Sequence, residues 1–256
     1  MEKKEFLNMF KESDKIIAAI IFEKMEKAYK TGQEIMTDEF VTREVSDKVL
    51  QSASKFGVKA ELFGFFEDAE RNIIGFSEYG ISIPAIKILK IKCGTKFREL
   101  KHSDFLGALM SIGLKREKFG DMVLKSGECY VPCDEKSAEI IVNNLNQIAT
   151  VPCKIKSYDY YEIEPVTPDF EEIIILAASF RADSMVSEIC NISRREAEEI
   201  IENGSLSVNY SEIKEKSYNI KESSVVSIKR YGKYIIDGAI GESKSGKIRI
   251  KCRKYT

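Results

Sequence analysis

Two adjacent arginines, Arg194 and Arg195, stand where a short helix is predicted to begin. Ser193 and Glu196 have the spacing of a capping box, in which each side chain bonds the backbone N–H of the other residue. The unpaired N–H groups of a first helical turn and the positive end of the helix dipole favour an anion. Two guanidinium groups at this place therefore predict a phosphate-binding site.

The helix that must position these arginines is short and has a clear end. Ala197 and Ile201 share an apolar face, and Gly204 is a typical helix stop. The same helix offers an alternative role for its arginines, because Glu198 and Glu199 follow Arg194 and Arg195 at a spacing of four residues. Such ion pairs are common on helices and contribute little stability.

Further functional residue types flank this helix on both sides. Arg181 and Asp183 form an Arg-x-Asp element that opens an earlier helical segment, and residues 206–209 alternate like a strand that enters a turn. A carboxylate is repelled by phosphate, so we expect Asp183 to orient Arg181 or to cap the helix rather than to touch an anion.

The order of these residues resembles the S-four RNA-binding domain, also called the alpha-L motif. The family pattern is Arg-x-Asp, then Ser-Arg-x-x-Ala, then Gly followed by Val-x-Val-Asn. The matching positions are Arg181, Asp183, Ser193, Arg194, Ala197, Gly204, Leu206, Val208 and Asn209. Ala182, Tyr210 and the pair Ser223-Ser224 depart from the usual Leu, Gly and Gly-Asp. The resemblance implies an RNA-binding domain in which the arginines contact RNA.

The stretch from residue 229 to residue 256 is the most cationic part of the chain, with nine Lys and Arg against Asp237 and Glu242. Lys229, Arg230 and Lys233 are candidate RNA-binding residues, with Tyr231 available for stacking. The alternative is an ordinary solvated edge strand, because lysines commonly protect sheet edges from aggregation.

A second candidate loop lies in the middle of the chain, after a helix that is predicted to begin at Ser103. This loop carries three cations and one aromatic residue, namely Lys115, Arg116, Lys118 and Phe119. Such a set can hold phosphates and stack on a base or a ribose. The alternative is that Phe119 packs beneath a sheet while the cations are simply solvated.

Two blocks around this loop resemble the bacterial YlmH-like proteins: LFGFFEDAERN at 62–72 and HSDFLGALMSIGLKREKFGDM at 102–122. The family architecture is an N-terminal region, a central RNA-binding domain and a C-terminal S-four domain. The resemblance implies a non-catalytic RNA-binding factor in ribosome-associated quality control, which engages a large ribosomal subunit that still holds peptidyl-tRNA. Its implied partners are ribosomal RNA and tRNA.

The elements that carry these residues predict an α+β chain of three parts. Residues 1–58 have helical periodicity, and residues 59–161 have strands and two helices in the split β-α-β order of a ferredoxin or RNA-recognition fold. Residues 162–169 contain two prolines and are predicted to be a linker. Residues 170–256 form the expected S-four domain with its basic extension.

Composition excludes several functional classes. Lys and Arg number 40 against 41 Asp and Glu, so an RNA-binding surface needs segregation of charge rather than an excess. The longest early apolar run, residues 16–22, is too short for a membrane span, and we expect a cytoplasmic protein. With one His, no Cys-x-x-Cys pair and no glycine-rich phosphate loop, we expect no metal, no cofactor and no small-molecule substrate.

Two alternatives remain open beside the binding factor. S-four domains also accompany RNA-modifying enzymes such as pseudouridine synthases and methyltransferases, but the preceding chain lacks their catalytic motifs. Members of the YlmH-like family are often encoded near cell-division genes, so a scaffold in cell division is the second alternative. Nothing in the sequence calls for a dimer, and we expect a monomer.

Overall fold

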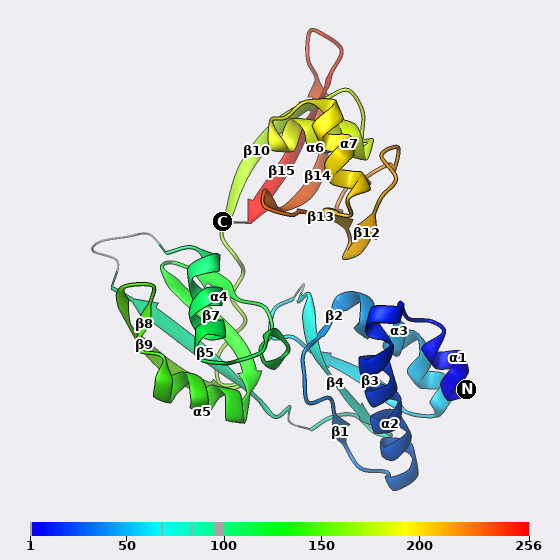
Figure 1. Cartoon of the computed structure of the whole chain (residues 1–256), viewed down its shortest axis with the longest axis vertical. Coiled ribbons are helices and arrows are strands. Elements are labelled where there is room, and N and C mark those ends of the chain that lie inside the picture. Colours follow the sequence, from blue (N-terminus) through cyan, green and yellow to red (C-terminus); the bar gives the residue numbers. More distant parts are fainter. Residues whose placement is uncertain (1, 68, 83, 95–99, 256) are drawn as a thin grey trace. The chain divides into compact units, whose positions relative to one another are not determined.

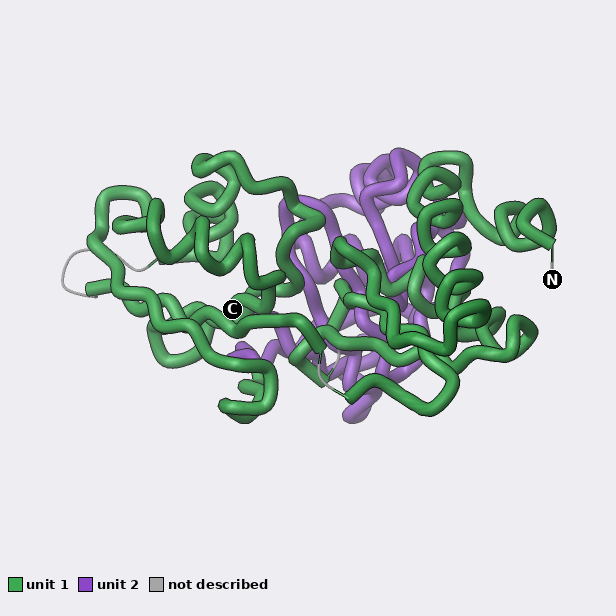
Figure 2. The backbone as a smooth tube through the Cα atoms, turned by 90° about the horizontal axis from the view of Figure 1, so that it is seen from below, with its two compact units in different colours: residues 1–167 green, residues 168–256 purple. Residues whose placement is uncertain are grey.

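The computed structural model describes residues 2–67, 69–82, 84–94 and 100–255. The chain is an α+β protein that divides into two compact units, residues 1–167 and 168–256 (Figure 2). The division lies inside the segment 162–169 that its prolines mark as a linker. Among the helices of the described residues, none combines the length and the apolar character that a membrane crossing needs.

The first part of unit 1, which we call the N-terminal lobe, packs helices on a small antiparallel sheet (Figure 1). Its helices are α1 (Lys3–Leu7), α2 (Lys15–Thr31) and α3 (Arg43–Ala53), and its strands are β1 (Ile35–Met36), β2 (Val41–Thr42), β3 (Lys59–Phe63) and β4 (Arg71–Ser77). Strand β4 pairs with the other three strands. The apolar faces of α2 and α3 are buried against Ile74 and Phe76 of β4.

The strands at residues 59–77 were expected to belong to the central sheet, but they form this separate sheet with the N-terminal helices. The expectation was wrong for a physical reason. Alternating apolar residues predict a strand and its buried face, whereas they do not say which sheet supplies the partner strand.

The second part of unit 1, the central lobe, has its elements in β-α-β-β-α-β-β order, which is the order of a split β-α-β fold with one additional short strand, β8. They are β5 (Ile86–Cys93), α4 (His102–Ser111), β6 (Val123–Lys125), β7 (Glu128–Asp134), α5 (Glu135–Asn144), β8 (Gln147–Ile148) and β9 (Val151–Asp159). The antiparallel sheet has the order β6-β7-β5-β9-β8. Leu109 of α4 and Ile141 of α5 share one core with Leu89 and Ile91 of β5, so both helices cover the same face of the sheet.

Unit 2 places two helices on one face of a six-stranded antiparallel sheet (Figure 1). Its elements are β10 (Phe170–Ala177), α6 (Ala182–Cys190), α7 (Arg194–Glu202), β11 (Leu206–Val208), β12 (Ser211–Ile213), β13 (Val225–Ile228), β14 (Gly232–Glu242) and β15 (Ile248–Tyr255). Met185 of α6 and Ile201 of α7 are buried with Ile236 and Ile250 of the sheet.

The strand order of unit 2, β10-β15-β14-β13-β11-β12, bears on the basic C-terminal stretch. Strands β14 and β15 carry most of its cations, and both lie inside the sheet rather than at an edge. The edge-strand alternative is therefore wrong for these residues. Long-range pairing with β10, about 80 residues earlier, decides the position of β15, and no local pattern reveals such a partner.

Phe119 lies in the core of the central lobe with none of its surface exposed, and it bridges to Cys133 of β7. The expectation that this ring could stack on a base is therefore wrong, and the alternative of packing beneath the sheet is what the structure shows. Burial of a phenylalanine removes a large apolar surface from water, which outweighs any weak affinity of an exposed ring for a base.

We expect Phe119→Ala to lower the free energy of unfolding by about 3 to 5 kcal/mol, because the substitution leaves a cavity in a close-packed core. Urea denaturation followed by circular dichroism measures this change. Lys115→Ala, at an exposed position four residues earlier, is the control and should shift stability by no more than about 0.5 kcal/mol. An unaltered transition midpoint for Phe119→Ala would contradict the assignment of this ring to the core.

Candidate nucleic-acid interface

Helix α7 begins at Arg194 and has the predicted capping box, which is confirmed in detail. The backbone N–H of Ser193 donates to Glu196 Oε2 at 2.8 Å, and Ser193 Oγ accepts from the backbone N–H of Glu196 at 3.3 Å. At the other end Gly204 has a φ of +68°, a conformation that glycine adopts without strain. These local bonds fix the position of the first turn of α7 and the direction in which the Arg194 side chain projects from it.

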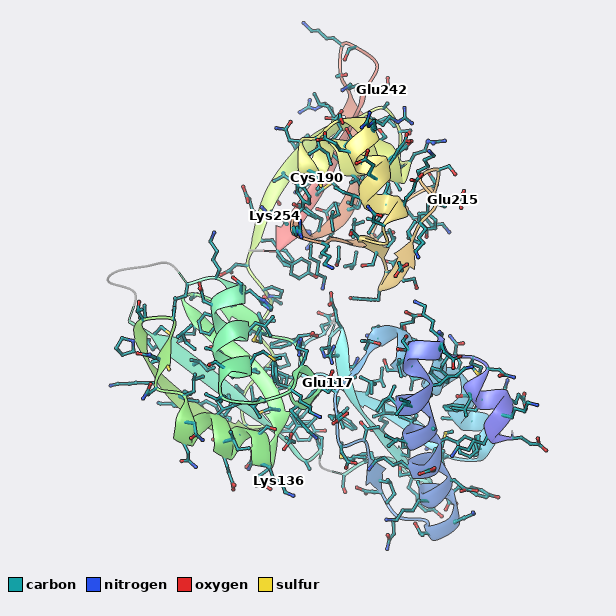
Figure 3. All side chains as sticks on the ribbon, viewed as in Figure 1. Glu117, Lys136, Cys190, Glu215, Glu242 and Lys254 are labelled. Atoms are coloured by element: carbon teal, nitrogen blue, oxygen red, sulfur yellow. The ribbon has the colours of Figure 1, made fainter. Side chains whose placement is uncertain are left out.

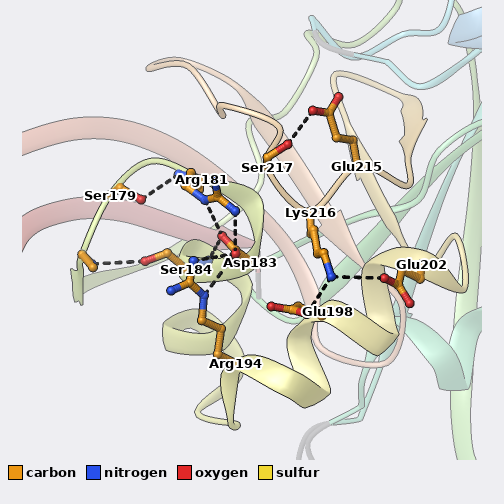
Figure 4. Close-up of polar contacts among 11 residues, drawn as sticks. Ser179, Arg181, Asp183, Ser184, Arg194, Glu198, Glu202, Glu215, Lys216 and Ser217 are labelled. Carbon is orange, nitrogen blue, oxygen red and sulfur yellow. Dashed lines mark hydrogen bonds and ion pairs between the residues drawn. The ribbon is translucent and has the colours of Figure 1, made fainter.

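The guanidinium groups of Arg181 and Arg194 meet at one carboxylate, that of Asp183 (Figure 4). Arg181 donates from Nε to Asp183 Oδ1 at 3.1 Å and from Nη2 to Oδ2 at 3.0 Å. Arg194 donates from Nε and Nη2 to the same Oδ2 at 3.0 and 2.6 Å. The expectation that Asp183 orients Arg181 is thus met by a bidentate pair, and the carboxylate holds Arg194 as well.

Asp183 is 1% exposed, and its charge depends on these partners. Burial alone would raise the pKa of the carboxyl group, but hydrogen bonds from Arg181 and Arg194 outweigh it and lower the pKa to about 2. The backbone N–H of Ser184 donates to Oδ1 at 2.9 Å and acts in the same direction. The carboxylate therefore stays ionised and keeps both guanidinium groups in place at neutral pH.

Both arginine side chains remain open to solvent, at 43% exposure for Arg181 and 56% for Arg194. A guanidinium has five N–H donors, and two from each group bond Asp183, so the others can bond an anion. Among the described residues, Arg194 pairs with Asp183 rather than with Glu198, which pairs with Lys216 at 2.9 Å.

Lys216 and two carboxylates lie beside the arginine pair (Figure 4). Lys216 Nζ is 2.9 Å from Glu198 Oε2 and 3.6 Å from Glu202 Oε1. The directed donors of two fixed guanidinium groups and the N-terminus of α7 are the features that suit an anion at this place.

The remaining candidates in unit 2 do not gather at this site. Arg195 Nε lies 3.3 Å from Glu199 Oε1, so the predicted alternative of an ion pair is present, although its side chain is 89% exposed. The backbone N–H of Lys229 donates to Ser205 O, which places Lys229 and the neighbouring Arg230 beyond the C-terminal end of α7. A nine-residue helix is roughly 13 Å long, which separates these cations from Arg194.

Lys233 lies on the sheet face opposite the helices, because the next residue, Tyr234, points into the core beneath α6 and α7. Its Nζ is 4.3 Å from the ring centroid of Tyr255 and 5.6 Å from that of Tyr210. Lys233 is therefore part of a cation and aromatic cluster on a different surface from the Arg181 and Arg194 pair.

The loop with Lys115, Arg116 and Lys118 belongs to the central lobe and contacts the N-terminal lobe. Arg116 Nη1 donates to the carbonyl oxygens of Phe119 and Gly120 at 2.7 and 2.9 Å, and burial, with the nearby charge of Arg71, lowers its pKa to about 10. Lys118 Nζ lies 3.4 Å from Glu39 Oε1 in the N-terminal lobe. The expected set of three solvated cations is thus reduced to the exposed Lys115.

The central lobe is similar to a known RNA-binding domain, because residues 84–162 match the family model described as "Putative RNA-binding domain in YlmH". A curated relative from Bacillus subtilis (strain 168), named "Ribosome-associated protein quality control protein P2", is 27% identical to this chain over 191 residues, which cover 73% of this chain and 74% of the relative.

A solved structure, "Cell division protein ylmH from Streptococcus pneumoniae", aligns with 60% of this chain and 96% of its own length at 17% identity and a TM-score of 0.48. Sequence reasoning missed Lys216, which bridges Glu198 at 2.9 Å and Glu202 at 3.6 Å beside the arginine pair. It lies in a connection without periodicity, so no pattern could have indicated it.

The pH dependence of folding tests the arrangement at Asp183. Its folded-state pKa lies below the ordinary value of 3.8, so its contribution to stability is complete above about pH 4 and is lost as the pH falls towards 2. We expect Asp183→Asn to remove that part of the acid dependence, on the order of 2 kcal/mol, and to destabilise the protein by a similar amount at pH 7. Urea unfolding between pH 2 and pH 7 measures both effects.

Glu199→Gln is the control for this experiment, because Glu199 is a half-exposed partner of Arg195 on the surface of the same unit. Its loss should alter stability by less than about 1 kcal/mol at any pH. Parallel pH profiles for Asp183→Asn and the unmodified protein would contradict a buried, ionised Asp183.

Proposed function

We propose that this protein is a YlmH-like, non-catalytic, cytoplasmic RNA-binding factor that binds structured ribosomal RNA and tRNA on the large ribosomal subunit. In this proposal the subunit carries peptidyl-tRNA, the protein serves ribosome-associated quality control as a monomer, and unit 2 acts as an S-four domain. Two comparisons support it: the RNA-binding family model that matches the central lobe, and the name of the Bacillus subtilis relative.

The observation that carries the proposal is the pair of guanidinium groups held on Asp183. Each has exposed N–H donors left, and each is fixed by two hydrogen bonds, so binding a phosphate costs little further side-chain entropy. Arginine forks match the oxygen atoms of phosphate in a bidentate manner, which a lysine cannot do.

This geometry suits recognition of RNA structure rather than recognition of a base sequence. The deep major groove of an A-form helix excludes side chains, so double-stranded RNA is recognised through phosphates, 2′-hydroxyl groups and shape. Backbone contacts of this kind position a protein on RNA, whereas base contacts would specify a sequence.

The first test changes both arginines to glutamine, Arg181→Gln with Arg194→Gln. Glutamine can still donate to Asp183, whereas alanine would leave that buried carboxylate without side-chain donors. We expect affinity for large subunits that carry peptidyl-tRNA to fall about tenfold, and the slope of log K against log salt to decrease by about 1 to 2, because two phosphate contacts are lost. Co-sedimentation over a salt series measures both quantities.

The matched control removes two cations from the opposite face of the same sheet, Arg249→Gln with Lys251→Gln. These residues alternate with Ile248, Ile250 and Cys252, which face the helices, so they point away from Arg194. The control should bind nearly as well as the unmodified protein. Normal co-sedimentation by a folded Arg181 and Arg194 double variant would refute the proposed role of the pair.

A separate measurement addresses catalysis. Mass spectrometry of ribosomal RNA and tRNA from cells with and without the protein should show the same set of modified nucleotides, since the proposed function is binding alone. Loss of one defined modification in the deletion strain, restored by the unmodified protein, would replace the binding factor with an RNA-modifying enzyme.

A further inference from the structure

The central lobe carries a set of lysines on the sheet face that α4 and α5 do not cover. Leu89 and Ile91 of β5 point into the core beneath those helices, so Lys90 and Lys92, which alternate with them, point to the other face. Strand register adds three more lysines on that face. The five residues, which we call the lysine face, are Lys90, Lys92, Lys125, Lys154 and Lys156.

The register shows how closely these lysines gather. Lys90 lies opposite Lys156, and Lys92 lies opposite Lys154, on the neighbouring strands β5 and β9. On the other side of β5, Glu128 of β7 lies opposite both Lys92 and Lys125. Adjacent strands are roughly 4.8 Å apart, so the cations form two short rows across the sheet.

These rows contain one acidic residue, Glu128, and it forms ion pairs with both Lys90 and Lys92. Glu128 lies 2.6 Å from Lys90 Nζ and 3.2 Å from Lys92 Nζ, and its side chain is only 14% exposed. Lys92 is nevertheless 70% exposed, and Lys154 and Lys156 are exposed with no ion pair to any described residue. The solvent-exposed groups of this surface are therefore the lysine ammonium groups, whereas the carboxylate of Glu128 is mostly buried beneath them.

The aromatic residues on the same face are not available for stacking on bases. Tyr130 lies opposite Lys90 and is 8% exposed, with Lys90 Nζ 5.4 Å from its ring centroid. Tyr158 and Ile88 pack into an apolar cluster with Phe40 and other residues of the N-terminal lobe, which covers that end of the sheet. The uncovered end offers charge without exposed rings, which suits phosphates rather than bases.

Protection of a sheet edge does not account for this distribution. Lysines on an edge strand discourage pairing with another chain, and Lys154 and Lys156 could serve that purpose on β9. Lys90 and Lys92, however, belong to β5, which pairs with β7 on one side and β9 on the other. Like charges on directly opposed residues destabilise a sheet. The pairs Lys90 with Lys156 and Lys92 with Lys154 therefore lower the stability of this sheet, and protection of the β9 edge does not explain why β5 carries lysines as well.

We propose that the lysine face is a second RNA-binding surface, which holds the phosphate backbone of structured RNA without reading its bases. This inference rests on the proposed function, since it assigns a further contact to the same RNA-binding factor. It places that contact on the lobe that matches the RNA-binding family model, at residues that were not among the candidates predicted from the sequence.

The test uses the full chain with Lys154→Gln and Lys156→Gln together, which leaves Glu128 and its two partners intact. The probe is a fluorescein-labelled RNA hairpin of about 16 base pairs, the span that a double-strand-binding domain covers. We expect affinity to fall about tenfold near 0.1 M salt, and the salt slope to decrease by about 1 to 2, for hairpins of unrelated sequence alike.

The control is Lys55→Gln with Lys136→Gln, which removes the same charge from unit 1. Lys136 lies on α5 (Figure 3), on the helix-covered side of the sheet, and both lysines are exposed. Equal binding by the two double variants would overturn the proposal. So would an unchanged affinity for the hairpin together with a lost affinity for poly-glutamate, which would assign the surface to an acidic protein segment.

The Arg181→Gln and Arg194→Gln variant in the same assay separates this inference from the proposed function. If that variant loses affinity while the Lys154 and Lys156 variant binds like its control, the proposed function stands and the lysine face is refuted. If only the lysine variant loses affinity, RNA binding belongs to the central lobe, and the assignment of the arginine pair is refuted instead.

Discussion

The ionised carboxylate of Asp183 is the constraint on which the rest of unit 2 depends. It lies at the first turn of α6, it is buried, and it fixes one guanidinium from its own segment and one from the start of α7. Two helices that contribute separately to the core are thereby tied together at their polar ends. The four hydrogen bonds to Asp183 stabilise this junction, and in the proposed function they also hold the remaining N–H donors of both arginines in place for a phosphate.

The features that could be predicted from the sequence are those set by neighbouring residues. The capping box at Ser193, the stop at Gly204 and the turn after Val208 each depend on chemistry within a few residues, and each is present. The family pattern implied that Arg181 and Arg194 contact RNA from one domain. That both would bond the same buried carboxylate required knowledge of how α6 and α7 pack, which no local spacing contains.

The features that could not be predicted depend on long-range partners. Phe119 and Arg116 had the composition of an RNA-binding loop, yet the loop joins two lobes through contacts with residues about 80 positions away. The lysine face was partly visible, because lysines alternate with apolar residues in the segments at 86–93 and 151–156. The alternation of lysines with apolar residues predicted that each strand has a polar side. Only the strand register showed that the lysines of neighbouring strands lie next to each other on one face of the sheet.

Strand β10 has one partner in the described sheet, β15, so the first and last strands of unit 2 must meet before β10 can join the sheet. During synthesis β10 leaves the ribosomal exit tunnel long before β15 does, and its exposed apolar residues remain without a partner in that interval. Closing a loop of this length is entropically costly and slow. A factor proposed to act on large ribosomal subunits that carry peptidyl-tRNA thus has a second unit that assembles only after nearly all of that unit has been translated.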